Sequence, residues 1–303
     1  MLSCDAAIVA NLFYNCVYST DRGMIEVSNN TSGRQAYNLH TGDSLLSQVN
    51  RVICILMPRA LALAGFSDKG DLLMIRYNDY KKNLPPWILD FFEHQFINEP
   101  LLAAPHKITA AYIASDKCML VPDVLYNSEA AEKWMRQLQF VEGNEIITPH
   151  HLADDKAQYL YAWPAAIKSL LTRYFAKGKE FPFASYQFYK PAKIEYALLC
   201  AVTPDFAYAT LYKNGSLQWH QGFEYQNSED IAFKIQMLCK QNDIDPVKLN
   251  LQCTGVAKSM NGIVQGLSQY FPQLKDGTGN VSSNDASWVS SISLFQQLYA
   301  CAL

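Results

Sequence analysis

The amino-acid sequence predicts an α/β fold in which one kind of lobe, a mixed sheet flanked by helices, is present twice. Two stretches about 145 residues apart contain the same order of three apolar strands, one amphipathic helix and a further strand. In both, a tight turn with a glycine joins the second and third strands, at Lys69-Gly70 and at Asn214-Gly215. Strands that alternate with helices indicate α/β layers, and strands joined by tight turns pair antiparallel, so each sheet is expected to be mixed.

The elements of the two repeats follow from hydrophobic periodicity. In the first repeat we expect strands at 52–56, 61–65 and 72–75, a helix that starts at 85–86 and runs to about 97, and a strand at 108–114. In the second we expect strands at 196–200, 206–211 and 217–219, a helix from Ser228, its expected N-cap, to about 241, and a strand at 249–253. A helix at 257–270 completes this repeat.

The remaining segments differ in kind from the repeats. Between the repeats we expect a strand at 118–121, a helix at 128–138 capped by Ser128, a strand at 158–162 and a helix at 164–175. At the N-terminus we expect a helix at 6–18 and a polar loop at 19–44, and at the C-terminus a linker at 275–285 and a last helix through Trp288 and Tyr299.

This order predicts duplicated ribonuclease-H-like lobes with five-stranded sheets. The expected division is an N-terminal extension (1–50), a first lobe with an insertion (51–178), a second lobe (179–274), and a linker with the C-terminal helix (275–303).

Composition favours a cytoplasmic protein. The net charge is −3, which gives no general attraction to nucleic acid or to an anionic membrane. The sequence contains neither a signal peptide nor the roughly 20 consecutive apolar residues of a membrane helix. The eight cysteines are scattered, several of them in apolar strands, and no pair has zinc-site spacing. We therefore expect reduced cysteines in the core, no metal site and no membrane insertion.

The second repeat carries a family resemblance. The stretch AVTPDFAYATLYKNGSLQWHQGFEYQNSEDIAFKI resembles the unit of actin-like ATPases, including FtsA and PilM, in which an acidic, glycine-rich turn joins two strands. LNLQCTGVAKS (249–259) is similar to the strand and turn that cover the adenosine in that superfamily. These stretches, with LVPDVLYN (120–127) and the strand at 158–164, also resemble a family of uncharacterised bacterial proteins with an actin-like ATPase fold. The resemblance covers about 51–272.

The departures from that resemblance bear on function. Active members of the superfamily have an Asp and glycines at the phosphate turns, where this chain has Met57-Pro58-Arg59 and Thr203-Pro204-Asp205-Phe206. The adenosine turn keeps one glycine, in Thr254-Gly255-Val256. Any nucleotide pocket is therefore expected to be vestigial, formed by Arg59, Thr203, Asp205, Thr254 and Gly255, with no catalytic residue and no cofactor.

Two further patterns have alternative interpretations. Residues 168–193 contain six basic side chains interleaved with aromatic ones, which can bind a nucleic-acid strand, or can be a helix face followed by rings that fill the core between the lobes. His150-His151 near Asp154-Asp155 could suggest a metal site, but adjacent residues of a strand face opposite ways, and we expect a loop here.

Three functional hypotheses follow. The first is a cytoplasmic pseudo-ATPase that binds another protein or serves as a scaffold. The second is a diverged nucleotide-binding ATPase or kinase-like enzyme that uses Asp205 and Gly255, for which nucleotide binding would be weak. The third is a nucleic-acid-associated role for residues 168–193, which the overall charge does not favour.

Overall fold

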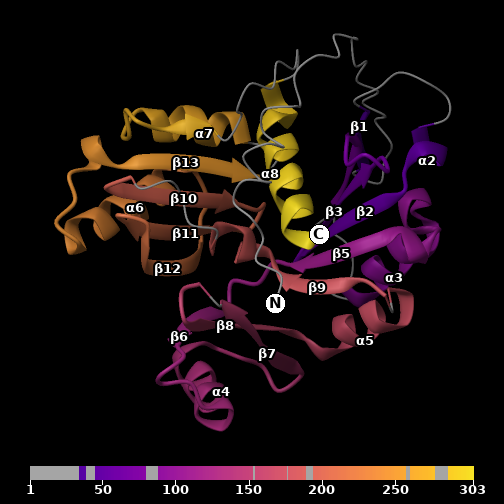
Figure 1. Ribbon diagram of the computed structural model, residues 1–303, viewed down its shortest axis with the longest axis horizontal. Coiled ribbons are helices and arrows are strands. Elements are labelled where there is room, and N and C mark those ends of the chain that lie inside the picture. The colour runs from indigo at the N-terminus through magenta and orange to yellow at the C-terminus, as the bar shows by residue number, and fades with distance from the viewer. Residues whose placement is uncertain are drawn as a thin grey trace.

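The computed structural model describes residues 34–38, 45–79, 88–152, 154–175, 177–188, 194–256, 260–276 and 286–303 (Figure 1). The helix expected at 6–18, most of the polar segment at 19–44 and the expected helix start at 85–86 lie outside these residues. So does the linker expected at 275–285, apart from its first two residues, which form a short strand instead.

The first lobe contains a mixed sheet of six strands. In spatial order they are β1 (Arg34–Asn38), β4 (Leu72–Asp79), β3 (Ala60–Phe66), β2 (Arg51–Met57), β5 (Ile108–Ile113) and β9 (Lys179–Pro182). The first four pair antiparallel with one another, whereas β5 pairs parallel with β2 and β9 parallel with β5. Its helices and 3-10 turns are α2 (Leu45–Gln48), α3 (Ile88–Asn98), η1 (Pro100–Leu102), η2 (Pro105–Lys107) and α5 (Ala165–Tyr174).

The second lobe repeats this topology with five strands. In spatial order they are β12 (Ser216–Glu224), β11 (Phe206–Lys213), β10 (Tyr196–Val202), β13 (Asn250–Gly255) and β14 (Lys275–Asp276). Its helices and 3-10 turn are α6 (Ser228–Gln241), η4 (Pro246–Lys248) and α7 (Met260–Ser268). The mixed, duplicated α/β architecture is thus confirmed.

The insertion in the first lobe is a small layer of its own, at the bottom of Figure 1. It consists of a three-stranded antiparallel sheet, in the order β6 (Cys118–Pro122), β8 (Ala157–Pro164) and β7 (Glu145–Leu152), and of α4 (Ser128–Leu138). Met135 of α4 and Leu160 of β8 belong to its separate small core.

Burial explains which strands the sequence showed most clearly. Every residue of β3 is buried, as are all but the last of β11, because both faces of these central strands are covered. β12, at the edge, alternates only partly between buried and exposed positions. The helices α4 and α6 begin one residue earlier than the serines suggested, because Asn127 and Asn227 are the N-caps whose side chains accept backbone N–H groups.

Three sequence-based assignments were wrong. Part of the polar segment at 19–44 forms β1, which makes the first sheet six-stranded instead of five-stranded. Lys179–Pro182, assigned to the second lobe, pairs with β5 of the first. His150-His151 lies in β7 and not in a loop. Each of these strands is at the edge of a sheet, where one face and one side remain open and the apolar pattern is correspondingly weak.

The C-terminal helix α8 (Ala286–Ala302) crosses between the two lobes (Figure 1). The helix expected through 288–299 is thus confirmed, with longer ends. From position 291 it is largely buried, including Ile292, Leu294, Phe295 and Leu298. It contacts β2, β4 and η3 (Phe183–Phe188) on one side and β13 on the other.

Candidate interlobe site

The two turns expected to face a nucleotide phosphate meet each other directly. Arg59 lies in the turn between β2 and β3, and Asp205 lies in the turn between β10 and β11. The Nε atom of Arg59 is 3.3 Å from Oδ1 of Asp205, with the side chains 50% and 19% exposed. The positive charge of Arg59, from the first lobe, therefore neutralises the carboxylate of Asp205, from the second lobe.

The backbone of the second turn is already engaged within the chain. The N–H of Thr203 donates to the carbonyl of Phe206 at 2.9 Å, and the N–H of Phe206 donates to the Thr203 hydroxyl oxygen at 3.1 Å. Pro204 has no N–H, and the carbonyl of Thr203 accepts the Tyr225 hydroxyl at 2.6 Å. Two of the four amides of this turn thus serve the turn itself and a third is absent, whereas phosphate-binding turns direct such amides at the ligand.

The expected adenosine turn is covered by the C-terminal helix. The Gly255 carbonyl accepts the hydroxyl of buried Ser291 of α8 at 2.9 Å. The Thr254 hydroxyl is buried and lies 2.7 Å from the Tyr186 hydroxyl of η3. A Cβ at Gly255 would lie 2.4 Å from the Val202 carbonyl oxygen, so this glycine is required by the close approach of β10 and β13.

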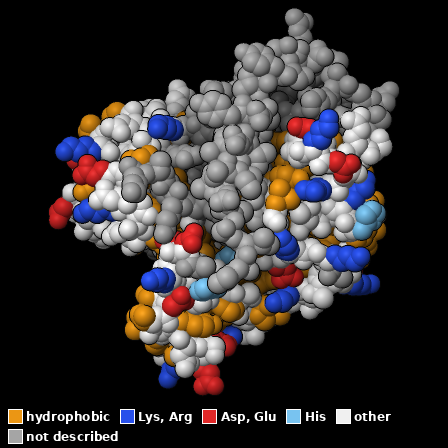
Figure 2. Space-filling view, viewed as in Figure 1, with side chains coloured by type: hydrophobic (Ala, Val, Ile, Leu, Met, Phe, Trp, Pro, Cys, Tyr) orange, Lys and Arg blue, Asp and Glu red, His pale blue; other side chains and the backbone are white. Residues whose placement is uncertain are grey.

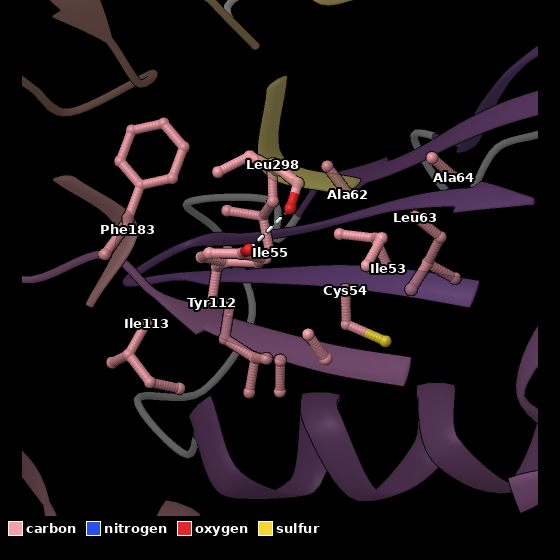
Figure 3. Close-up of a cluster of buried hydrophobic side chains, with 14 of the residues drawn as sticks. Ile53, Cys54, Ile55, Ala62, Leu63, Ala64, Tyr112, Ile113, Phe183 and Leu298 are labelled. Carbon is pink, nitrogen blue, oxygen red and sulfur yellow. Dashed lines mark hydrogen bonds between the residues drawn. The ribbon is translucent and has the colours of Figure 1, made fainter. Parts of the chain in front are cut away.

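Helix α8 is fastened to the first lobe by three polar contacts. The Tyr112 hydroxyl of β5 donates to the Leu298 carbonyl at 2.6 Å, the dashed line in Figure 3. Lys179 Nζ donates to the Ala302 carbonyl at 2.9 Å, which satisfies a carbonyl of the last helical turn. One guanidinium nitrogen of Arg51 donates to the Tyr299 hydroxyl at 2.7 Å.

Of the five residues expected to form a vestigial pocket, the structure therefore brings Arg59 and Asp205 together. Thr203 supports the turn before Asp205, while Thr254 and Gly255 contact η3 and α8.

A network of buried and half-buried polar side chains, which sequence analysis missed, lies where the insertion meets the second lobe. The Thr210 hydroxyl donates to Gln187 Oε1 at 3.0 Å and lies 2.7 Å from His220 Nδ1. Since its one hydrogen goes to Gln187, the Thr210 oxygen must accept from Nδ1–H of His220. His220 Nε2 is then an acceptor that faces the Cys118 thiol at 3.9 Å. Only the pairing register of β11 and β12, which places Thr210 opposite His220, could have indicated this network.

The environment of His220 is aromatic and uncharged. The rings of Phe188, Tyr159 and Tyr208 lie 5.0, 5.2 and 6.1 Å from the imidazole, centroid to centroid. Burial lowers the pKa of His220 to about 3 and raises the pKa of the Cys118 thiol to about 11. A neutral imidazole and a neutral thiol, the first half-buried and the second buried, form a structural bridge between the second lobe and the insertion.

The cysteine assignment holds for the described residues. Cys54, Cys118, Cys200, Cys239 and Cys253 are buried thiols outside any disulfide, and Cys301 is half-buried.

The described residues also include parts of the two remaining sequence patterns, the basic and aromatic stretch at 168–193 and the pair His150-His151. Phe183 and Phe188 are buried in the core that joins the lobes, which agrees with the structural interpretation and removes both rings from contact with bases. His151 Nε2 lies 3.1 Å from Asp123, while the His150 ring lies 5.9 Å from the Phe181 ring. Across the part of the chain that the structure describes, no three potential metal ligands converge.

None of the described helices is long and apolar enough to cross a membrane.

The fold and the two facing turns define the class of protein. A protein of unknown function from Bacteroides thetaiotaomicron VPI-5482 with an actin-like ATPase fold is similar over 84% of this chain and 99% of its own, at a TM-score of 0.66 and 14% identity. A chain of the PilM–PilN type IV pilus biogenesis complex is similar over 84% of this chain and 98% of its own, at a TM-score of 0.53 and 12% identity. The chain therefore has the actin-like ATPase fold.

Within that fold class, the chain belongs to the family described as protein of unknown function DUF3822, whose model matches residues 56–274. No curated protein matches the sequence.

Proposed function

We propose that this protein is a pseudo-ATPase of actin-like fold that works in the cytoplasm as a binding or scaffold protein for another protein. It uses the two-lobed body as a rigid support and performs no phosphoryl transfer.

The ion pair between Arg59 and Asp205 is the main support for this proposal. In an active site of this kind an acid at a phosphate turn is needed to organise a metal ion, and here the only acid of either turn faces a guanidinium at 3.3 Å. The engaged amides of Thr203 and Phe206 and the proline in each turn support the same conclusion, because they reduce the number of donors left for a phosphate.

Two observations favour a protein partner over a small ligand. PilM is found in a complex with PilN, a protein. The insertion exposes large apolar side chains, among them Phe140 (82% exposed) and Leu138 (71% exposed), and Figure 2 shows apolar side chains gathered over this part of the molecule. Exposed apolar groups of this size on a folded chain are common where another protein docks.

Thermal unfolding of the purified chain with millimolar ATP or ADP, with and without Mg²⁺, tests the proposal. A ligand that binds only the native state at about 100 times its Kd adds about 2.7 kcal/mol, a shift of a few degrees. We expect no Mg²⁺-dependent shift and no ATP turnover. A shift that requires Mg²⁺ and is lost in Asp205→Ala would instead establish the diverged enzyme.

A further inference from the structure

We propose that contacts within the chain latch the two lobes in one closed arrangement, with Arg59 and Asp205 linked where an active relative would hold a nucleotide and metal ion. This inference rests on the proposed function, because a scaffold benefits from a fixed shape that needs no ligand. A partner could then recognise surfaces of both lobes at once, at every nucleotide concentration.

The first component of the latch is the ion pair itself. It joins the tips of two hairpins from different sheets, so any opening of the lobes at this point must separate Arg59 from Asp205. The guanidinium is half exposed, so the contact is accessible to solvent and individually weak. The ion pair therefore forms only when the lobes are in this position, and it is too weak to hold them together by itself.

The second component is α8, which holds both lobes by buried contacts. Ser291 near its start donates to Gly255 of the second lobe, and Leu298 near its end accepts from Tyr112 of the first. Opening the lobes would break one of these bonds and leave a buried polar group unsatisfied, which costs far more than loss of an exposed ion pair.

The third component lies at the junction with the insertion. The Tyr208 hydroxyl of β11 donates to the backbone carbonyl of Ser115 at 2.7 Å. Ser115 lies just after β5, and both residues are buried. His220 of β12 contacts Cys118 of β6 close by. Because the three components lie on separate elements, a hinge motion about any one of them strains the other two.

Hydrogen exchange measured by mass spectrometry on the full-length chain, without nucleotide, tests the latch. We compare wild type with Arg59→Ala, Asp205→Ala and the double variant, and follow peptides that contain 57–60 and 203–206. Arg136→Ala is the matched control, since it removes an exposed arginine whose partner, Glu132, lies on the same helix.

If the latch exists, each single variant accelerates exchange in both turns by about two- to fivefold, and the double variant does no more than either single variant. Arg136→Ala leaves both turns unchanged. Effects confined to the mutated turn, or effects that add in the double variant, would overturn the proposal.

Tyr112→Phe provides an independent arm because it removes the buried bond to α8 and keeps the ring. We expect it to accelerate exchange in α8 and in both turns, whereas acceleration limited to α8 would contradict the latch. Failure of the proposed function can be distinguished from failure of the latch. The first would appear as a Mg²⁺-dependent shift of the melting temperature, and the second as exchange rates in the two turns that change independently with no nucleotide present.

Discussion

Tyr112, in strand β5 of the first sheet, donates its phenol hydrogen to the backbone carbonyl of Leu298, 186 residues further along the chain. The contact is buried, 2.6 Å long, and fixes the C-terminal helix against β5 (Figure 3). This relationship explains why a helix at the end of the chain is part of the core.

Removal of the Tyr112 hydroxyl should destabilise the protein without changing its packing. We expect Tyr112→Phe to lower the free energy of unfolding by about 1–2 kcal/mol, because a buried carbonyl loses a partner. Urea denaturation followed by circular dichroism measures this. Tyr270→Phe, at an exposed position, should change stability by less than about 0.5 kcal/mol, and an equal loss in both variants would contradict the assignment.

Gly255 should tolerate no side chain, because β10 approaches it closely. A Cβ would lie 2.4 Å from the Val202 carbonyl, so we expect Gly255→Ala to cost about 1–3 kcal/mol as the strands move apart. Gly262 is the matched control, because a Cβ there meets nothing within 4 Å and the residue lies in α7. Gly262→Ala should stabilise the protein by about 0.5–1 kcal/mol. Equal unfolding midpoints for the two variants would refute the steric argument.

The stability of the protein should fall with acidification because of His220. Its pKa is about 3 when folded and about 6.5 when unfolded, so between these values only the unfolded chain binds the proton. The contribution is therefore constant above pH 6.5 and declines by up to about 1.4 kcal/mol per pH unit below it. Denaturant unfolding between pH 7 and pH 5 measures the slope.

His220→Gln should reduce that slope, even though it lowers stability at pH 7 by disturbing the bond with Thr210. His106→Gln, at an exposed position, should leave the slope unchanged. An unaltered slope in His220→Gln would show that other groups carry the pH dependence.

The buried thiols should react only when the protein unfolds. We expect alkylation mapped by mass spectrometry to modify Cys301 in the native protein, while Cys54, Cys118, Cys200 and Cys253 react at the rate of global unfolding. Burial raises the pKa of Cys54 and of Cys118, so little reactive thiolate is present even where reagent enters. Rapid native-state labelling of Cys118 would contradict the closed junction around His220.

The central strands were predictable, whereas three of the edge strands were not. β3 and β11 are buried on both faces, and their continuous apolar runs appear in the sequence. β1, β7 and β9 become strands because a neighbour supplies hydrogen bonds, and their polar or short sequences give no comparable signal. The candidate site shows the same division: the residue types of the two turns can be read from the sequence, whereas the contact between Arg59 and Asp205 cannot.

The sequence by itself determined the repeated order of strands and helices and the residue types of the two facing turns, because turn residues and hydrophobic periodicity act over a few neighbouring positions. Only the tertiary structure decided that Arg59 meets Asp205, that α8 lies between the lobes and that His220 faces Cys118. These contacts join residues that are far apart in the chain, and they form because sheet pairing and core packing bring distant segments together. No local pattern encodes which distant side chain will lie within a few ångströms.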